Sequence, residues 1–241
     1  MLARFENAAA AMNALRRNQE RVANNLANAN TTGYKRDRFF TEALNERLDA
    51  QGAPRSDRRV RQTSDLSPGA LEDTGNPLDV ALGGEGFFVT RAPDANAPHY
   101  TRAGHFVVGN EGTLRTPGGK AVLGEGGPIQ VPLNADGDLR IAKDGTITAG
   151  GDPVGTLRVV TFDAPEEMDR VQGAAFAAGG AAPEPADAPT VLQGKLETSN
   201  VSPITEMTDM IETSRHYQAQ QKSLRTTNEV LSRATQTLGR L

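Results

Sequence analysis

The stretch MIETSRHYQAQQKSLRTTNEVLSRATQTL, residues 210–238, decides which kinds of fold are open to this chain. Large apolar or aromatic side chains recur in it at every seventh residue: Met210, Tyr217, Leu224, Leu231 and Leu238. A heptad repeat of this length predicts an α-helix that packs along one face against other helices. Ser202 followed by Pro203 marks the expected start, because serine caps helix N-termini and proline fits the first helical position.

The first thirty residues carry a second heptad pattern, with one polar member. The repeat consists of Phe5, Met12, Gln19 and Leu26, and apolar residues follow three positions later at Ala8, Leu15 and Val22. The alanines favour a helix, and Thr31-Thr32-Gly33 predicts its end, with Gly33 in a left-handed conformation. An ordinary core-facing helix is the alternative interpretation of either pattern.

Between these segments the period changes from that of a helix to that of short strands. Runs such as GFFVT (86–90), GTITA (145–149) and GTLRVVTF (155–162) are separated by glycine-containing turns. Several short β-type runs with tight turns predict an antiparallel all-β domain. The expected fold class is therefore mixed and mainly β, with long terminal helices that form a coiled-coil-like layer.

The expected organisation has six parts. They are an N-terminal helix (1–35), a polar connector (36–73), a central β domain (74–173), a flexible low-complexity loop (174–189), a return strand or connector (190–200) and a C-terminal helix (201–241).

The lengths of the predicted helices decide how they are used. At about 1.5 Å per residue the first helix is about 45 Å long and the last is more than about 50 Å. A β domain of about a hundred residues has a radius of gyration near 13 Å, so it covers neither helix. Ordering each residue costs about 1–2 kcal/mol, which the heptad side chains alone do not offset. We therefore expect further burial against other copies or partners.

Composition excludes several classes of function. The chain has no cysteine, which removes disulfides, thiolate nucleophiles and cysteine-bound metals. Tryptophan is absent and aromatic residues make up 5% of the chain, which argues against a stacking platform for bases or glycans. The net charge of -4 predicts no nucleic-acid surface, and no apolar run approaches the roughly 20 residues of a membrane span. The N-terminus lacks the apolar core of a secretory signal.

A catalytic site is not expected either. His99, His105 and His216 have no accompanying serine or cysteine motif, so surface or packing roles are the default. Glu85 and Glu125 follow glycines in predicted hairpin turns, and they provide the one enzyme alternative, a glycosidase pair. The sequence therefore predicts no catalytic, cofactor or metal site.

Two charged segments suit turns and surface contacts better than ligand sites. Asp136-Gly137-Asp138 and Asp144-Gly145 lack the third acidic position and terminal glutamate of an EF-hand. A basic cluster, expected as a solvated loop or as an electrostatic contact to an acidic neighbour, consists of Arg55, Arg58, Arg59 and Arg61.

Four motifs in order carry a resemblance to a known family. They are NNLANANTTGYKR (24–36), TGNPLDVALGGEGFFVT (74–90), YTRAGHFVVGNEGTLRTPGGKAVLGEGGPI (100–129) and LETSNVSPITEMTDMIETSRHYQAQQKSL (196–224). Together they resemble the flagellar basal-body rod and hook family. Within it, the modest length and AVLGEGGPI are most similar to proximal-rod members, and distal-rod members are close. The chain departs from the family pattern at Ala29, Asn30 and Pro203.

The resemblance implies an axial structural protein rather than an enzyme. It implies export through the flagellar type III apparatus without a cleaved signal, and helical polymerisation in the periplasm with copies of itself and other rod proteins. It implies no cofactor, small-molecule substrate, nucleic acid or direct membrane insertion. Two alternatives come from other classes: an enzyme that acts on cell-wall glycan, and an adhesive or binding module with helical dimerisation ends.

The terminal segments are expected to supply the assembly interface. Asparagine side chains both donate and accept hydrogen bonds, so in a close-packed helical tube they can bridge neighbours and fix register. The alternative is that they bond only to their own backbone. The residues expected at the interface are Phe5, Met12, Leu15, Val22, Asn24, Asn25, Leu26, Asn28, Gly33, Tyr34, Met210, Tyr217, Leu224, Leu231 and Leu238.

Overall fold

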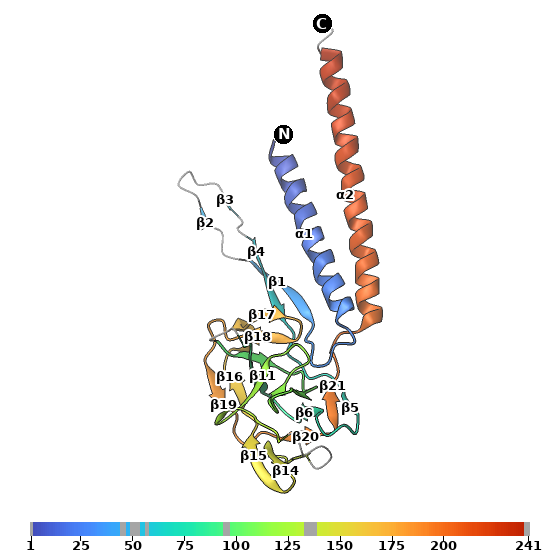
Figure 1. The fold of residues 1–241 in the computed structure, drawn as a ribbon. Coiled ribbons are helices and arrows are strands. Elements are labelled where there is room, and N and C mark those ends of the chain that lie inside the picture. Colours follow the sequence, from blue (N-terminus) through green and yellow to red (C-terminus); the bar gives the residue numbers. More distant parts are fainter. Residues whose placement is uncertain are drawn as a thin grey trace. The chain divides into compact units, whose positions relative to one another are not determined.

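A computed structural model describes residues 2–43, 47–48, 54–55, 58–93, 97–132 and 139–238 of the chain. The described fold is mainly β, with one long helix at each end (Figure 1). The chain divides into two compact units, a helical unit of Met1–Ala27 with Ser202–Leu241 and a β-rich unit of Asn28–Val201. The predicted combination of terminal helices and antiparallel strands is confirmed.

The helical unit consists of α1 (Leu2–Ala27) and α2 (Pro203–Leu238), which run antiparallel beside one another (Figure 1). The heptad positions of α1 from Ala8 to Leu26 are half-buried or buried, whereas most positions between them are exposed. The helix α2 begins at Pro203, as its sequence predicts. The Thr205 hydroxyl donates to Ser202 Oγ at 3.0 Å, and the Glu206 N–H donates to the Ser202 carbonyl at 3.0 Å.

The end of α1 differs from the prediction. The helix stops at Ala27, and the Asn28 carbonyl accepts a hydrogen bond from the Thr31 N–H at 3.0 Å in the turn that follows. Gly33 is left-handed as predicted, with φ of 65°, but it does not cap the helix. Its N–H donates to the Glu197 carbonyl at 2.7 Å, so this backbone conformation serves a contact distant in sequence.

The β-rich unit is built from antiparallel pairs throughout its described strands. The largest sheet follows the order β17-β18-β8-β7-β11-β10-β9, with β12 joined to β11, and with β16 joined to β7 and β19. Its strands are β7 (Phe87–Arg91), β8 (His99–Thr101), β9 (Val107–Val108), β10 (Leu114–Arg115), β11 (Ala121–Gly124), β12 (Gly127–Pro128), β16 (Val159–Phe162), β17 (Asp169–Gln172), β18 (Ala175–Ala177) and β19 (Pro183–Pro185).

Smaller sheets complete the unit. Two of them join the beginning of the unit to its end, because β5 pairs with β21 and β6 pairs with β20. The remaining elements are β1 (Asp37–Ala43) with β4 (Arg58–Ser64), β2 (Arg47–Leu48) with β3 (Pro54–Arg55), β5 (Leu71–Asp73), β6 (Val80–Leu82), β13 (Leu139–Ile141) with β14 (Thr146–Ala149) and β15 (Asp152–Thr156), the short 3-10 helix η1 (Pro165–Glu167), β20 (Val191–Gln193) and β21 (Lys195–Glu197).

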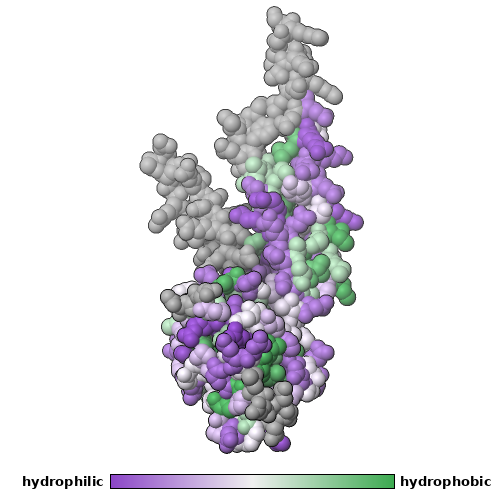
Figure 2. Space-filling model, viewed as in Figure 1, coloured by the Kyte–Doolittle hydropathy of each residue, from purple (hydrophilic) through white to green (hydrophobic). Residues whose placement is uncertain are grey.

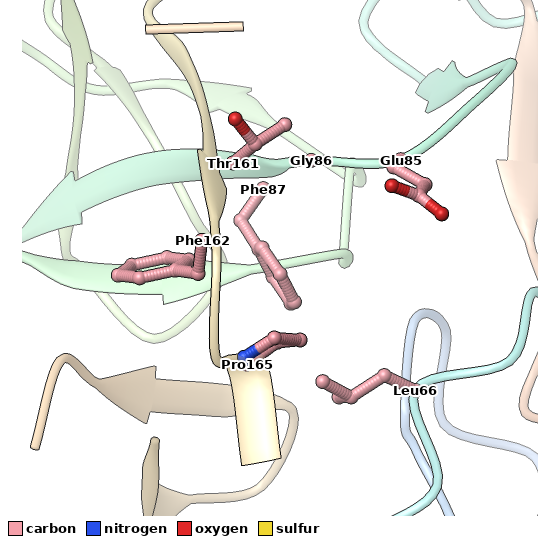
Figure 3. A pocket seen from close by; sticks show the side chains of 7 residues that line it. All are labelled: Leu66, Glu85, Gly86, Phe87, Thr161, Phe162 and Pro165. Atoms are coloured by element: carbon pink, nitrogen blue, oxygen red, sulfur yellow. The ribbon is translucent and has the colours of Figure 1, made fainter. Parts of the chain in front are cut away.

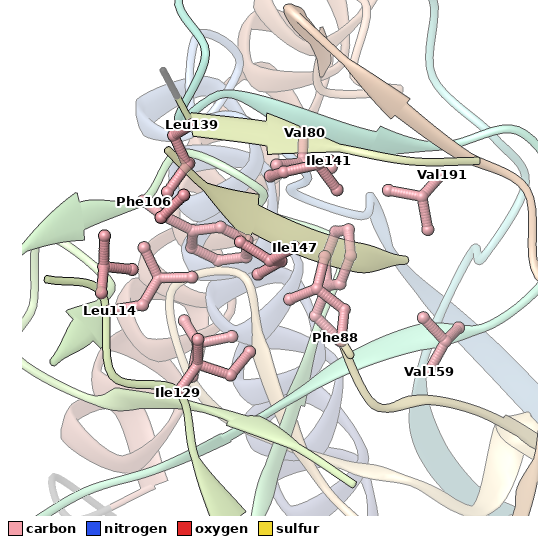
Figure 4. Close-up of a cluster of buried hydrophobic side chains, with 14 of the residues drawn as sticks. Val80, Phe88, Phe106, Leu114, Ile129, Leu139, Ile141, Ile147, Val159 and Val191 are labelled. Atoms are coloured by element: carbon pink, nitrogen blue, oxygen red, sulfur yellow. The ribbon is translucent and has the colours of Figure 1, made fainter. Parts of the chain in front are cut away.

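Two apolar clusters fill the β-rich unit. In the larger, the Phe88 ring meets the Phe106 ring edge-on at a centroid distance of 5.4 Å, and the fully buried Ile147 lies between strands beside them (Figure 4). In the other, the Phe87 ring packs edge-on against Phe162 and Phe176, at 5.9 and 6.0 Å. Successive residues of β7 therefore face different clusters, since Phe88 belongs to the larger one and Phe87 and Val89 belong to the other.

Residues 174–189 are more ordered than their composition suggests. The prediction of a loop without secondary structure was wrong, because the segment contains β18 and β19. Phe176 is the reason, since its ring is buried beside Phe87 and places β18 between β17 and β8. A single aromatic residue among alanines and glycines is too weak a periodic signal to predict a strand.

The segment expected as a polar connector also contains paired strands. Strand β1 pairs with β4 over seven positions, from Asp37 opposite Ser64 to Ala43 opposite Arg58. The arginine cluster therefore lies on strands rather than on a solvated loop: Arg55 is in β3, and the other three are in β4. Because their side chains lie outside the described ones, the expectation of an acidic neighbour stays a prediction. Charged residues conceal the strands, since no apolar alternation is present.

Candidate assembly site

The two helices of the helical unit are joined by polar contacts as well as by apolar ones. Asn18 Nδ2 donates to Thr213 Oγ1 at 3.0 Å, and Arg21 lies 3.8 Å from the fully buried carboxylate of Glu206. Polar pairs inside a helix seam favour one register over its alternatives. The sequence interpretation missed all four residues, because a heptad pattern identifies apolar positions alone.

The structure places the described apolar heptad residues of the predicted interface on this seam, whereas Asn28, Gly33 and Tyr34 belong to the β-rich unit. Val22 is fully buried, while the other apolar members whose side chains are described remain half-buried: Met12, Leu15, Leu26, Met210, Tyr217 and Leu224. The side chains of Phe5, Leu231 and Leu238 lie outside the described ones. The α1–α2 contact within one chain thus covers the predicted interface only in part.

The asparagines at the end of α1 do not share one environment. Asn25 is fully buried in the folded chain and interacts there, Asn24 is exposed, and Asn28 is half-buried. The Asn28 side chain accepts a hydrogen bond from the Thr31 hydroxyl at 3.2 Å, which is a local contact but one between side chains. Bridging between subunits through these amides stays a proposal, and Asn24 is the member exposed for it.

A buried charge cluster lies where the chain enters and leaves the β-rich unit. Lys35 Nζ contacts Glu197 Oε1 at 2.5 Å and donates to the Ser67 carbonyl at 2.7 Å. Arg102 approaches the other carboxylate oxygen of Glu197 at 3.4 Å, and the Gly69 N–H donates to Oε1 at 2.9 Å. The Glu197 carboxylate thus binds two cations, Lys35 and Arg102, and the backbone at Gly69. The side chains of Lys35, Arg102 and Glu197 are each at least nine-tenths buried.

Desolvation dominates the electrostatics of this cluster. Burial lowers the pKa of Lys35, and the hydrogen bond and charge of Glu197 oppose that shift. Burial likewise lowers the pKa of Arg102, again against the charge of Glu197. Two cations held by one anion depend on it strongly, because an unpaired buried charge is costly.

Tyr34 and Arg170 form a second anchor at the base of the β1–β4 pair. The Arg170 guanidinium lies 4.4 Å from the centroid of the buried Tyr34 ring and 4.8 Å from that of Phe176. It also donates through Nε to Asp37 Oδ1 at 3.0 Å and through Nη2 to Ser64 Oγ at 3.0 Å. Hydrogen bonds and ring contacts together hold the start of β1 and the end of β4 against Arg170 of β17.

A partly open pocket of about 130 Å³ is described on the β-rich unit (Figure 3). Its wall is largely apolar, with Leu66, Phe87 and Pro165 converging from separate segments and Glu85 at one side. Glu125 is not among its lining residues, so the two glutamates of the enzyme alternative do not share this pocket. Among described residues no group of three or more His, Asp or Glu side chains could hold a metal ion.

The three histidines occupy unrelated positions. His105 Nδ1 lies 2.6 Å from Asp79 Oδ1, beside an isolated β-bridge between the same residues. His99 lies in β8, where burial and then the charge of Lys120 lower its pKa, and His216 is exposed on α2. They do not meet in one site.

Asp65 provides a pH-dependent test of the region around the charge cluster. Burial acts to raise the pKa of Asp65, but hydrogen bonds from Ser67 and the charges of Arg38 and Arg36 outweigh it and lower the pKa. The stability that Asp65 contributes is therefore present above about pH 4 and is lost as the pH falls through the lowered value. Asp65→Asn should flatten the dependence of stability on pH in this acid range, measured by urea unfolding from about pH 2.5 to 6. An unchanged slope in the variant would contradict the assignment.

Comparison with known proteins connects this arrangement to a family. Residues 5–35 match the model described as "Flagella basal body rod protein", and residues 81–149 match "Flagellar hook protein FlgE/F/G D1 domain". Residues 192–237 match "Flagellar basal body rod FlgEFG protein C-terminal". The three matches cover α1 with the turn after it, a large part of the β-rich unit, and β21 with α2, in that order.

Whole-length relatives agree with these matches. The chain is 38% identical to the flagellar basal-body rod protein FlgF of Salmonella typhimurium over 92% of each chain, and 32% identical to FlgF of Caulobacter vibrioides over 94% of each. It is 33% identical to the rod protein FlgG of Bacillus subtilis, over 87% of this chain and 89% of the relative. The chain therefore belongs to the flagellar basal-body rod protein family. Neither α1 nor α2, as described, is long and apolar enough to cross a membrane.

Proposed function

We propose that this chain is a structural subunit of the bacterial flagellar rod, in its proximal part, and that interfaces rather than an active site carry its function. The observation that supports this most is similarity along the whole chain to the rod proteins FlgF, at 38% and 32% identity. A distal-rod position is the second candidate, because FlgG of Bacillus subtilis is 33% identical. The subunit is exported through the flagellar type III apparatus without a cleaved signal and assembles in the periplasm with copies of itself and other rod proteins.

In this proposal the terminal helices form an inner helical layer and the β-rich unit forms the outer part of each subunit. The half-burial of Met12, Leu15, Tyr217 and Leu224 supports it, since heptad side chains that remain partly exposed in one chain gain cover from neighbouring helices. The polar contacts Asn18–Thr213 and Arg21–Glu206 keep the α1–α2 pair in one register while it packs.

Leu224→Asp tests the proposal, because it places a charge on the helix seam of the helical unit. We expect recovery of the subunit in isolated basal bodies to fall by about tenfold or more, as for loss of an interface hot spot, with loss of swimming in soft agar. The thermal transition of the β-rich unit should be unchanged.

Ala219→Asp is the matched control, because Ala219 is exposed on the same helix and also gains a negative charge. It should assemble as the unmodified chain does. Full recovery of Leu224→Asp in basal bodies would show that the seam is not the assembly interface.

A further inference from the structure

The β-rich unit ends with residues 190–201, which we name the closing segment. It contains β20 and β21, and each of them pairs with one strand from the earlier part of the unit (Figure 1). Strand β20 places Val191 opposite Leu82 of β6, and β21 places Glu197 opposite Leu71 of β5. Among the described strands β5 and β6 have no other strand partner, so both depend on the closing segment for their pairing.

The closing segment also provides backbone partners outside its strands. The Gly194 carbonyl accepts a hydrogen bond from the Thr74 N–H at 2.8 Å, and the Gly194 N–H donates to the Asp79 carbonyl at 2.8 Å. The Thr198 N–H donates to the Ala70 carbonyl at 2.8 Å. Backbone polar groups in a folded chain are nearly always paired. The stretch of residues 70–79 therefore takes backbone partners from the closing segment along its length.

Apolar contacts lead to the same dependence. Val191 is 1% exposed and belongs to the larger apolar cluster, with Phe88 and Ile147. Val201 packs with Tyr34 in a separate cluster. The face of the β-rich unit in Figure 2 shows only small hydrophobic areas between hydrophilic ones. Without the closing segment, the larger cluster would lose Val191 and the packing that this side chain provides.

The strongest dependence is electrostatic. Lys35 and Arg102 are buried, and Glu197 of the closing segment is the carboxylate that contacts both of them. Without Glu197, the preceding part of the unit would have to bury two cations that lack this partner. Uncompensated buried charges are strongly destabilising, so the native fold of residues 28–189 is unfavourable without the closing segment.

The closing segment also comes late in the chain. Glu197 follows Lys35 by 162 positions and Arg102 by 95. Because the N-terminal part of a chain is synthesised first, the two cations are present long before their carboxylate. Contacts between such distant residues form slowly, since the entropy of loop closure is lost before the contacts are made.

We infer that the closing segment is a strap that has to dock before the β-rich unit folds. Residues 28–189 therefore stay unfolded until the chain is complete as far as residue 201. The use of this delay rests on the proposed function, because a unit that folds last is still unfolded when the chain is passed to an export channel. The order of folding does not depend on that function.

The folding rate of a full-length variant tests the strap. Glu197→Ala should slow folding of the β-rich unit by about tenfold, because the contacts of Glu197 form in the rate-limiting step. Refolding from urea, followed by pulse-labelling hydrogen exchange of amides in the unit, measures the rate. Glu111→Ala is the matched control, since the mostly exposed Glu111 pairs with Arg115, and it should fold at the unmodified rate. An unchanged folding rate in Glu197→Ala, with faster unfolding alone, would overturn the inference.

The unmodified chain provides a second test, which does not depend on the stability of a variant. The amides of Leu114 and Leu157 are hydrogen-bonded within the unit, as are those of Val191 and Thr198 in the closing segment. All four should gain protection from exchange in one kinetic phase. Protection of Leu114 and Leu157 before Val191 and Thr198 would show that the core folds without the strap, and it would overturn the inference.

The outcomes separate this inference from the proposed function. If the core gains protection first while the chain is recovered in isolated basal bodies, the closing segment is not a strap, and the rod assignment stands. If the unmodified chain is missing from isolated basal bodies, the proposed function itself fails, whatever the order of folding.

Discussion

Replacing Glu197 with alanine should lower the free energy of unfolding of the β-rich unit by about 3–5 kcal/mol. Glu197 is the single anion between Lys35 and Arg102, and all three side chains are nearly inaccessible to water. Removing it leaves two desolvated cations facing one another and deprives the Gly69 N–H of its acceptor. Urea unfolding of the full chain, followed by circular dichroism, measures the loss.

The control for Glu197→Ala is an exposed ion pair in the same unit. Lys195 Nζ contacts Asp73 Oδ1, and the Asp73 side chain is 79% exposed. Asp73→Ala should therefore cost at most about 1 kcal/mol, because water screens surface pairs. Equal losses in the two variants would show that the Lys35–Glu197–Arg102 cluster contributes no more than a surface contact.

Gly33→Ala should destabilise the β-rich unit by about 3 kcal/mol, the second large effect. Gly33 has φ of 65°, which costs an L-residue about 1–2 kcal/mol. A methyl group there would also lie 2.3 Å from the Ala103 backbone nitrogen and 2.4 Å from the Arg102 carbonyl carbon, so one of the two backbones must move. The same unfolding measurement, with basal-body recovery as a second reading, tests it.

Gly75→Ala separates the two causes. Gly75 has φ of 69°, and a methyl group there meets nothing within 4 Å, so this variant carries the conformational cost alone, about 1–2 kcal/mol. We expect the difference between the variants to measure the close approach of residue 33 to the 102–103 backbone. Equal losses of unfolding free energy in Gly33→Ala and Gly75→Ala would mean that the 102–103 backbone moves away from the added methyl group without cost.

Both large effects concern the two segments that connect the units. The Gly33 N–H donates to the Glu197 carbonyl, and the Arg36 N–H donates to Asn200 Oδ1 at 2.7 Å. The segment after α1 and the segment before α2 are thus held to one another inside the β-rich unit. Damage to these contacts should therefore reduce the stability of the β-rich unit.

Local chemistry determined the elements that the sequence predicted well. The helix start depends on a capping serine, Ser202, and on Pro203 at the first helical position. The strand run GFFVT depends on consecutive β-type residues after a glycine-containing turn. The heptads correctly indicated which face of α1 is buried. Each of these signals lies within a few residues of the element that it predicts. Residues adjacent in the chain are therefore enough to predict the element.

In the candidate site, too, residues in a local pattern were predicted and contacts across space were not. The heptad predicted seam residues such as Val22 and Tyr217, but not the Arg21–Glu206 contact that crosses the seam. A charged residue in a helix is normally on its solvated face, so burial of Glu206 depends on which residue lies opposite in space.

The sequence by itself determined the two helices, the family and those short strands that follow β-type runs such as GFFVT and GTITA. The tertiary structure alone decided that Lys35, Arg102 and Glu197 meet in a buried cluster, that Arg170 packs on Tyr34 and Phe176, and that Gly33 must be glycine for a contact rather than for a helix cap. The physical reason is separation along the chain. Lys35 and Arg102 are 162 and 95 positions from Glu197. The free energy of a buried charge depends on the groups around it in space, which no local pattern encodes.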